Sequence, residues 1–290
     1  MRSVKLLLRT FLLLLIMRAP FAIGAADSPS APAPADLVLV RQGSLPIILT
    51  APHGGRLAIP GVAERAVDKP GRRATGSYAS FVTGTDTNTD ILVQKIAAEI
   101  RAITGKAPYL VMAKFQRKFI DVNRPPDVGL DDPMARQYYD YYHGTIRRFV
   151  DEVRARFPAA ILIDVHGQHM MPSVIMRGTH NGDSVGALLK RGGFDAVTGP
   201  NGIFGRLEAN GFKVFPGNNV PTRGKFENAG LNGGYTVGAY GSNTPQGIDA
   251  IQTEFGTDYR ALPVLDKSGK DAGRAIAEFY EAYLISSAGK

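Results

Sequence analysis

The chain contains 290 residues, of which 44% are hydrophobic and 21% are charged, and its formal net charge is +8. This balance is typical of a globular protein and argues against a mostly disordered chain. The absence of cysteine excludes disulfides, thiolate metal sites, iron–sulfur clusters and cysteine nucleophiles, so any metal site must use His, Asp and Glu.

The N-terminus, residues 1–26, has the pattern of a secretory signal peptide. Basic residues precede the apolar run Phe11–Met17, and small residues then lead to Ala25 and Ala26, near which we expect cleavage. The run is too short to span a bilayer, which needs about 20 apolar residues. The alternative is an uncleaved anchor at the membrane interface. We therefore expect a periplasmic or secreted protein with no stable membrane span after cleavage.

The signal peptide also accounts for half of the net charge. It contains four basic and no acidic residues, so cleavage lowers the formal net charge from +8 to +4. The chain has no run of five or more Lys and Arg residues. This mild charge predicts no nucleic-acid partner.

After the signal peptide, residues 27–36 are rich in Pro, Ala and Ser and predict an extended linker. Residues 37–290 show no clear internal boundary, and we expect one domain. Its first apolar runs, Leu37–Val40 and Ile47–Thr50, predict two strands that pair as a hairpin across residues 41–44. Residues 54–85 then predict a long polar loop.

The rest of the chain alternates between helical and extended patterns. Apolar spacing predicts helices at 86–103, 131–157, 184–191, 202–210 and 267–287, the first of them capped by Thr85 or Asp86. Short apolar runs predict strands at 109–113, 119–122, 160–165, 174–176, 213–215 and 248–255, and the glycine-rich segment 223–247 predicts a loop. This alternation indicates an α/β fold with a mixed, largely parallel sheet flanked by helices on both faces.

Three polar side chains lie where predicted strands end. His53 follows the strand at 47–50, His166 follows the strand at 160–165, and Glu254 is near the end of the strand at 248–255. Ligands bind at the carboxyl ends of strands in open α/β sheets, so these residues could share a site. Two imidazoles and a carboxylate suit a hydrolytic zinc centre. The alternative, that the histidines are structural residues, stays open at this point.

Six short segments follow one another between about Pro46 and Tyr259: TAPHGG, GTDTNTDIL, FQRKFIDVNRP, LIDVHGQ, LNGGYT and AIQTEF. Together and in this order they resemble the N-formylglutamate amidohydrolase family, within the zinc carboxypeptidase-like superfamily. The resemblance covers nearly the whole predicted domain. It implies a zinc-carboxypeptidase-like fold and metal-dependent hydrolysis, and it is much less specific for the substrate.

The resemblance implies three zinc ligands. His53 and His166 match the two histidine ligands. Carboxypeptidases take their third ligand from a glutamate three residues after the first histidine, but here that position is Arg56. The acidic residue that the family has at the start of the following helix matches Asp86, which we expect to be the third ligand unless it only caps the helix. Two other acids compete for this role: Asp90 and Glu64.

The resemblance also implies roles for four further residues. Glu254 matches the general base, and Arg117 matches the arginine that polarises the scissile carbonyl and stabilises the oxyanion. Asn123 and Arg124 match the pair that binds a substrate carboxylate, for which a guanidinium fork is well suited. The alternatives are a paired carboxylate at Glu254, a solvated Arg117, and a turn with a surface ion pair at 123–124.

These expectations define an exported zinc-dependent amidohydrolase. Its substrate would be a small N-formyl or N-acyl amino acid, or a short peptide with a free carboxylate. One alternative is a zinc carboxypeptidase or amidase that acts on short peptides or cell-wall fragments, because N-formylglutamate itself is expected inside the cell. A second alternative is a non-catalytic periplasmic binding protein on the same fold.

Overall fold

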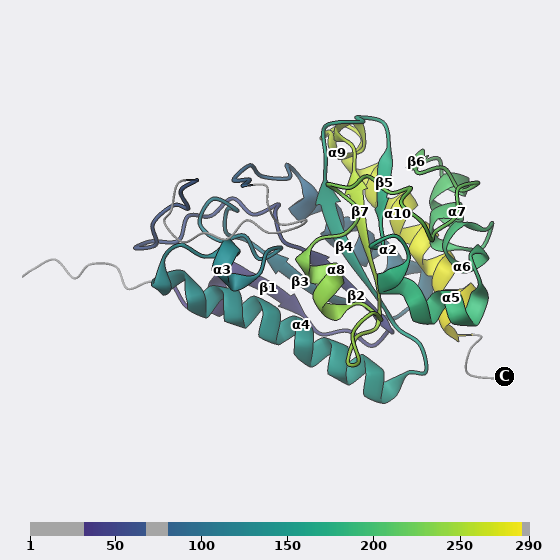
Figure 1. The fold of residues 1–290 in the computed structure, drawn as a ribbon, viewed down its shortest axis with the longest axis horizontal. Coiled ribbons are helices and arrows are strands. Elements are labelled where there is room, and N and C mark those ends of the chain that lie inside the picture. Colours follow the sequence, from purple (N-terminus) through teal and green to yellow (C-terminus); the bar gives the residue numbers. More distant parts are fainter. Residues whose placement is uncertain (1–31, 68–80, 286–290) are drawn as a thin grey trace, which may run out of the picture. The chain divides into compact units, whose positions relative to one another are not determined.

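The fold is built around one β-sheet. A computed structural model describes residues 32–67 and 81–285, and in these residues seven strands form a sheet in the order β1-β3-β2-β4-β7-β5-β6 (Figure 1). The strands are β1 (Val38–Arg41), β2 (Ile47–Ala51), β3 (Tyr109–Ala113), β4 (Ile161–Gly167), β5 (Ile175–Gly178), β6 (Val214–Phe215) and β7 (Asp249–Phe255).

The strand directions confirm a mixed, largely parallel sheet. β3, β2, β4 and β7 are parallel neighbours, whereas β1 runs antiparallel to β3 and β5 runs antiparallel to β7. β6 is parallel to β5. Every residue of β2, β3 and β7 is buried, as expected for strands whose two faces are both covered.

Helices cover both faces of the sheet, which confirms the predicted α/β class (Figure 1). Ile161 and Ile163 of β4 point into one hydrophobic core and Leu162 into the other, because successive side chains of a strand alternate. The first core is closed by α2 (Thr89–Thr104) and α10 (Leu265–Tyr280), and the second by α4 (Arg136–Arg156). Shorter helices in the described residues are α1 (Pro34–Leu37), α3 (Pro126–Gly129), α5 (Gly186–Gly192), α6 (Asp195–Thr198), α7 (Ile203–Ala209), α8 (Tyr235–Tyr240) and α9 (Thr257–Arg260).

The N-terminal predictions are only partly covered by the structure. The predicted signal peptide and most of the predicted linker lie outside the described residues. The end of the linker segment forms the helical turn α1. The assignment of 37–290 to one domain stays a prediction.

The predicted hairpin between the first two strands is wrong. β1 pairs with β3, and β2 lies between β3 and β4. The connection passes the start of β3, where the backbone N–H groups of Ser44 and Leu45 both donate to the carbonyl of Ala107. The fully buried β2 thereby has two parallel neighbours, β3 and β4, whereas a hairpin would pair it antiparallel with β1.

Three local predictions are also wrong. Residues 119–122 form turns and irregular backbone instead of a strand: the N–H of Asp121 bonds the carbonyl of Gly129, and the side chains of Phe119, Ile120 and Val122 enter the second core. The segment 223–247 contains the helix α8, whose first turn is held by a bond from the N–H of Thr236 to the side chain of Asn123. α2 is preceded by Asn88 in a left-handed conformation, and neither Thr85 nor Asp86 caps it.

Ile163 gives a direct test of the core. It lies in β4 with 1% of its surface exposed. Ile163→Ala is expected to lower the free energy of unfolding by about 2–5 kcal/mol, because it removes buried methylene groups and leaves a cavity. Ile163→Val, the matched control, should cost only about 0.5–1.5 kcal/mol. Urea denaturation measures both, and equal losses would contradict this packing.

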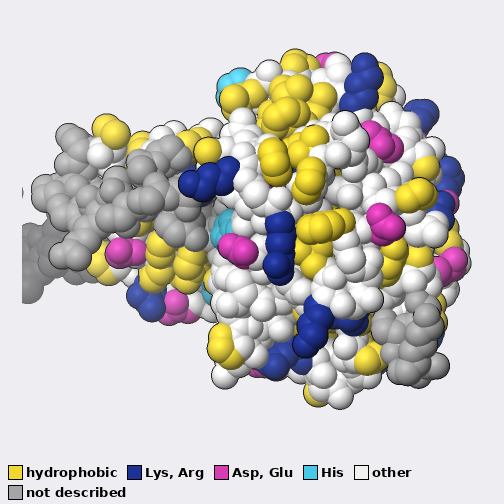
Figure 2. Space-filling view, turned by 45° about the vertical axis from the view of Figure 1, so that its right-hand side comes forward, with side chains coloured by type: hydrophobic (Ala, Val, Ile, Leu, Met, Phe, Trp, Pro, Cys, Tyr) yellow, Lys and Arg dark blue, Asp and Glu magenta, His cyan; other side chains and the backbone are white. Residues whose placement is uncertain are grey.

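On the face seen in the space-filling view, basic side chains are distributed among acidic and hydrophobic ones (Figure 2). Within residues 32–67 and 81–285, none of the helices combines the length and apolarity that crossing a membrane requires.

Candidate active site

The three predicted metal ligands come from three segments at one edge of the sheet. His53 lies two residues beyond β2, and His166 is the penultimate residue of β4. β2 and β4 are parallel neighbours, so their carboxyl ends meet at this edge. Asp86 lies in the loop before α2, where its N–H donates to the carbonyl of His53 at 3.0 Å. Backbone hydrogen bonding therefore brings the loop to the strand ends.

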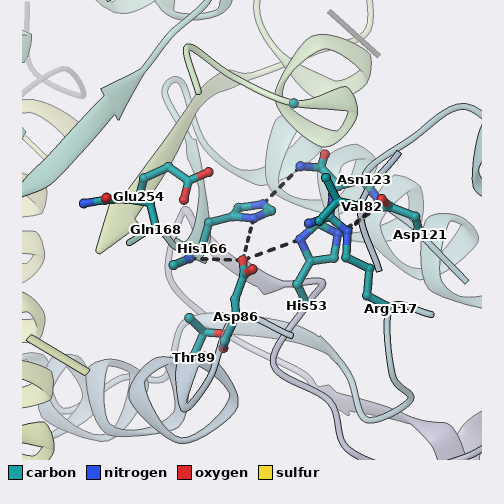
Figure 3. Close-up of polar contacts among 12 residues, drawn as sticks. His53, Val82, Asp86, Thr89, Arg117, Asp121, Asn123, His166, Gln168 and Glu254 are labelled. Atoms are coloured by element: carbon teal, nitrogen blue, oxygen red, sulfur yellow. Dashed lines mark hydrogen bonds and ion pairs between the residues drawn. The ribbon is translucent and has the colours of Figure 1, made fainter. Parts of the chain in front are cut away.

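The side chains of these residues converge on one point (Figure 3). Asp86 Oδ2 lies 3.5 Å from His53 Nδ1 and 3.2 Å from His166 Nδ1, and the three possible ligand atoms lie within 4.8 Å of one another. Ligand atoms around a tetrahedral zinc ion are about 3.3 Å apart, given zinc–ligand bonds of about 2.0–2.1 Å. His53 Nδ1 is buried and has no hydrogen-bond partner among the described residues. The donor set therefore fits a zinc ion.

The second nitrogen of each imidazole is held by a buried carboxylate. His53 Nε2 lies 2.7 Å from Asp121 Oδ1, and His166 Nε2 lies 2.9 Å from Asp164 Oδ2. Such a carboxylate accepts the Nε2 proton and leaves the Nδ1 lone pair for a metal ion. With the proton on Nε2, the Nδ1 lone pairs of both rings would be directed towards Asp86.

The electrostatics of this cluster favour a positive charge between the three side chains. Burial by itself raises the pKa of Asp86, but its interactions with His166 and His53 outweigh burial and bring the pKa below its ordinary value. Burial by itself lowers the pKa of His166, but the charge of Asp164 raises it well above its ordinary value. The acidic side chains around the two rings therefore attract a proton or a cation.

Glu254 lies beside this cluster on the next strand. In the pairing of β4 with β7 it is opposite His166, and only 4% of its surface is exposed. Its Oε1 accepts a hydrogen bond from Gln252 Nε2 at 2.9 Å. Burial raises the pKa of Glu254 to about 7, with the charge of His166 opposing this shift and that of Asp86 adding to it. A carboxylate of this kind suits general-base chemistry near neutral pH.

All seven predicted site residues line one cavity of about 410 Å³. They are His53, Asp86, Arg117, Asn123, Arg124, His166 and Glu254. The competing acids do not line it: Glu64 pairs with Lys118 at 2.5 Å, and Asp90 lies 3.8 Å from Arg56. The structure therefore favours Asp86 over Asp90 and Glu64 as the third member of the group.

The two arginines differ in how they are held. Arg117 Nε donates to Asp121 Oδ2 at 2.8 Å, so Asp121 links it to His53. Arg124 donates from Nη1 to the carbonyl of Asn123 at 2.9 Å, and its own carbonyl accepts from Tyr139. Both side chains are nearly buried and supply positive charge to the cavity wall.

Asn123 has extensive contacts within the protein. Its Oδ1 accepts from the N–H of Thr236 at 2.9 Å. Its Nδ2 lies 3.2 Å from His166 Nε2 and 3.4 Å from Gln252 Oε1. These contacts hold the start of α8 against the cluster of His53, Asp86 and His166. Asn123 therefore shapes the cavity as well as lining it.

Sequence reasoning missed several residues of the site. Asp164 and Gln252 each lie two positions before a predicted residue on the same strand, and this spacing places both members of a pair on one face. A polar residue inside each otherwise apolar strand, two positions before a predicted site residue, could have indicated both of them. Asp121, a buried partner of His53, lies 68 positions away in the chain, so no local pattern identifies that pairing.

Neither a protein-family model nor a curated protein matches the sequence. Two solved structures have a similar fold. The first is N-formylglutamate amidohydrolase from Ralstonia eutropha JMP134, with 16% identity over 85% of this chain and 98% of that chain, and a TM-score of 0.57. The second is a gene product of Agrobacterium tumefaciens, with 15% identity over 87% of this chain and 94% of that one, and a TM-score of 0.53. The chain thus has the α/β fold that its resemblance to the N-formylglutamate amidohydrolases predicted.

Proposed function

We propose that this protein is an exported, zinc-dependent amidohydrolase. Its substrate would be an N-formyl or N-acyl amino acid, or a short peptide, with a free carboxylate. The observation that carries the proposal is the convergence of His53, Asp86 and His166 beside the buried carboxylate of Glu254 in one cavity. The N-formylglutamate amidohydrolase with the same fold supports amide hydrolysis as the reaction. Export rests on the signal-peptide pattern of residues 1–26.

In this proposal His53, Asp86 and His166 hold the metal ion. A zinc ion bound there would activate a water molecule and polarise the substrate carbonyl. Glu254 accepts a proton from the attacking water and delivers it to the leaving nitrogen. The C–O bond forms and the C–N bond breaks, which gives a carboxylic acid and an amine.

Arg117 and Arg124 supply positive charge opposite the negative groups of the substrate. Arg117 donates to the oxyanion that develops on the carbonyl, and the bond from its Nε to Asp121 keeps its guanidinium at the cavity wall. Arg124 binds the substrate carboxylate, for which its planar fork of donors is suited. Asn123 holds the glycine-rich segment at the start of α8, which forms another part of the wall.

The test starts with the zinc content of the mature protein and its rate of substrate hydrolysis. We expect about one zinc per chain, hydrolysis of N-formylglutamate or another N-acyl amino acid from a panel, and loss of activity on chelation. Turnover only of short peptides or cell-wall fragments would indicate the carboxypeptidase or amidase alternative. Saturable ligand binding without turnover, unaffected by chelator, would indicate a binding protein and contradict the proposal.

The pKa of Glu254 predicts an acidic limb in the pH profile. The base must be deprotonated to accept a proton, so kcat/KM should fall about tenfold per pH unit below its pKa. Burial raises this pKa to about 7, and a bound cation would lower it by favouring the carboxylate. We therefore expect the limb at or below pH 7. Zinc binding measured over the same pH range separates this effect from protonation of the histidines, and a flat profile would contradict the role of Glu254.

A further inference from the structure

Arg260 occupies the point where three segments of the candidate site meet. It lies at the end of the short helix α9, and only 6% of its surface is exposed. Its guanidinium donates to three backbone carbonyls: Nη1 to Thr87 at 2.5 Å, Nε to Phe255 at 2.9 Å and Nη2 to Gln168 at 3.1 Å. All three nitrogens thus bond the protein backbone, and the residue also lines the cavity.

Each of these carbonyls belongs to a residue just beyond a proposed catalytic or metal-binding residue. The pairs are Thr87 after Asp86, Gln168 two positions after His166, and Phe255 after Glu254. They come from the loop before α2, the end of β4 and the end of β7. One planar, rigid group therefore connects the three backbone segments that directly follow two candidate ligands and the candidate base.

Two neighbouring residues are adapted to this arrangement. A Cβ atom at Gly167 would lie 2.4 Å from Arg260 Cζ, so the guanidinium can take its place only because residue 167 is a glycine. Asn88, in the left-handed conformation, donates from Nδ2 to the carbonyl of Arg260 at 2.8 Å. The loop that carries Asp86 is thus bonded to Arg260 in both directions.

We propose that Arg260 is a positioning residue, which sets the mutual geometry of Asp86, His166 and Glu254 and thereby the affinity of the site for its metal ion. This inference rests on the proposed function. A lysine could not replace the arginine, because its compact ammonium group cannot reach three separated carbonyls with the fixed fork of a guanidinium.

The test compares zinc dissociation constants, measured by chelator competition, for the wild type, Arg260→Lys and Arg260→Met. Both variants are expected to bind zinc about 10–100-fold more weakly, the range typical of residues that orient metal ligands. When saturated with zinc, they should show a lower kcat at an unchanged KM, because the base is displaced while Arg117 and Arg124 still bind substrate.

Arg177→Lys is the matched control. Arg177 is also buried and donates from Nη2 towards the carbonyls of Val220 and Pro221, but it lies on β5 and does not line the cavity. This variant should lose stability in thermal unfolding and keep the zinc dissociation constant of the wild type. A purely structural role for Arg260 would give the same result for its own variants.

Wild-type zinc affinity and kcat in both Arg260 variants would overturn the inference. If Arg260→Met does not fold, Arg260→Lys decides it, because it keeps the positive charge and loses the fork that reaches three carbonyls. Failure of the proposed function has a different signature, because the wild type itself would then bind no zinc.

Discussion

Glu254→Gln is expected to lower kcat by about 10²–10⁴-fold, the usual contribution of a general base. Glutamine has nearly the same shape as glutamate but cannot accept a proton from water. The carboxylate is buried, and Gln252 donates to its Oε1. The zinc content should stay at the wild-type level because Glu254 is not a member of the metal group. Steady-state kinetics and metal analysis of the same preparation measure both quantities.

The control for this variant is Asp249→Asn. Asp249 is another buried carboxylate of β7, and burial raises its pKa too. It lies at the opposite end of the strand, where it binds the N–H of Leu188 and the guanidinium of Arg191. Its replacement should affect stability and leave kcat close to the wild-type value. A Glu254→Gln variant with wild-type kcat would show that another group accepts the proton.

Asp86→Asn is expected to abolish stoichiometric zinc binding and, with it, hydrolysis. The substitution removes the negative charge that faces both Nδ1 atoms and replaces a strong oxygen ligand with a weak amide. Asp90→Asn should keep zinc and activity, since Asp90 lies outside the cavity. Metal analysis after dialysis measures the difference between the variants.

These two aspartates form a matched pair because both lie near the start of α2, four positions apart. General damage to the start of the helix would affect both variants alike, whereas a metal ligand gives a large difference between them. Zinc loss in Asp90→Asn with zinc retained in Asp86→Asn would reverse the assignment. Zinc retained in both would mean that the two histidines bind the ion with another partner.

Residues at strand ends were the most predictable part of the site. His53, His166 and Glu254 could be grouped from the sequence because parallel strands bring their carboxyl ends to one edge. Asp86 needed the family resemblance, since its own pattern is equally that of a helix cap. In the structure Asn88 precedes the helix instead, and the side chain of Asp86 is directed to the histidines.

The remaining residues could not be predicted because their interactions are not local. Asp121 bonds a ring nitrogen of His53, and Arg260 bonds three carbonyls that every residue type carries. Every residue type has a backbone carbonyl, so the residues that Arg260 binds form no sequence motif that could identify it. α8 was missed for a related reason: its glycine-rich surroundings favour a loop, and a contact with Asn123 stabilises its first turn.

The reversal of β5 has a consequence for how the substrate range can change. Because β5 runs antiparallel to β7, the connection 168–174 leaves β4 and enters β5 at the same edge of the sheet. It carries His169 and the exposed Met170, both of which line the cavity. Insertions or deletions within 169–173, beyond the carbonyl of Gln168 that Arg260 binds, would remodel the cavity rim without altering strand order. Substrate preference can therefore diverge among proteins of this fold while the metal centre stays constant.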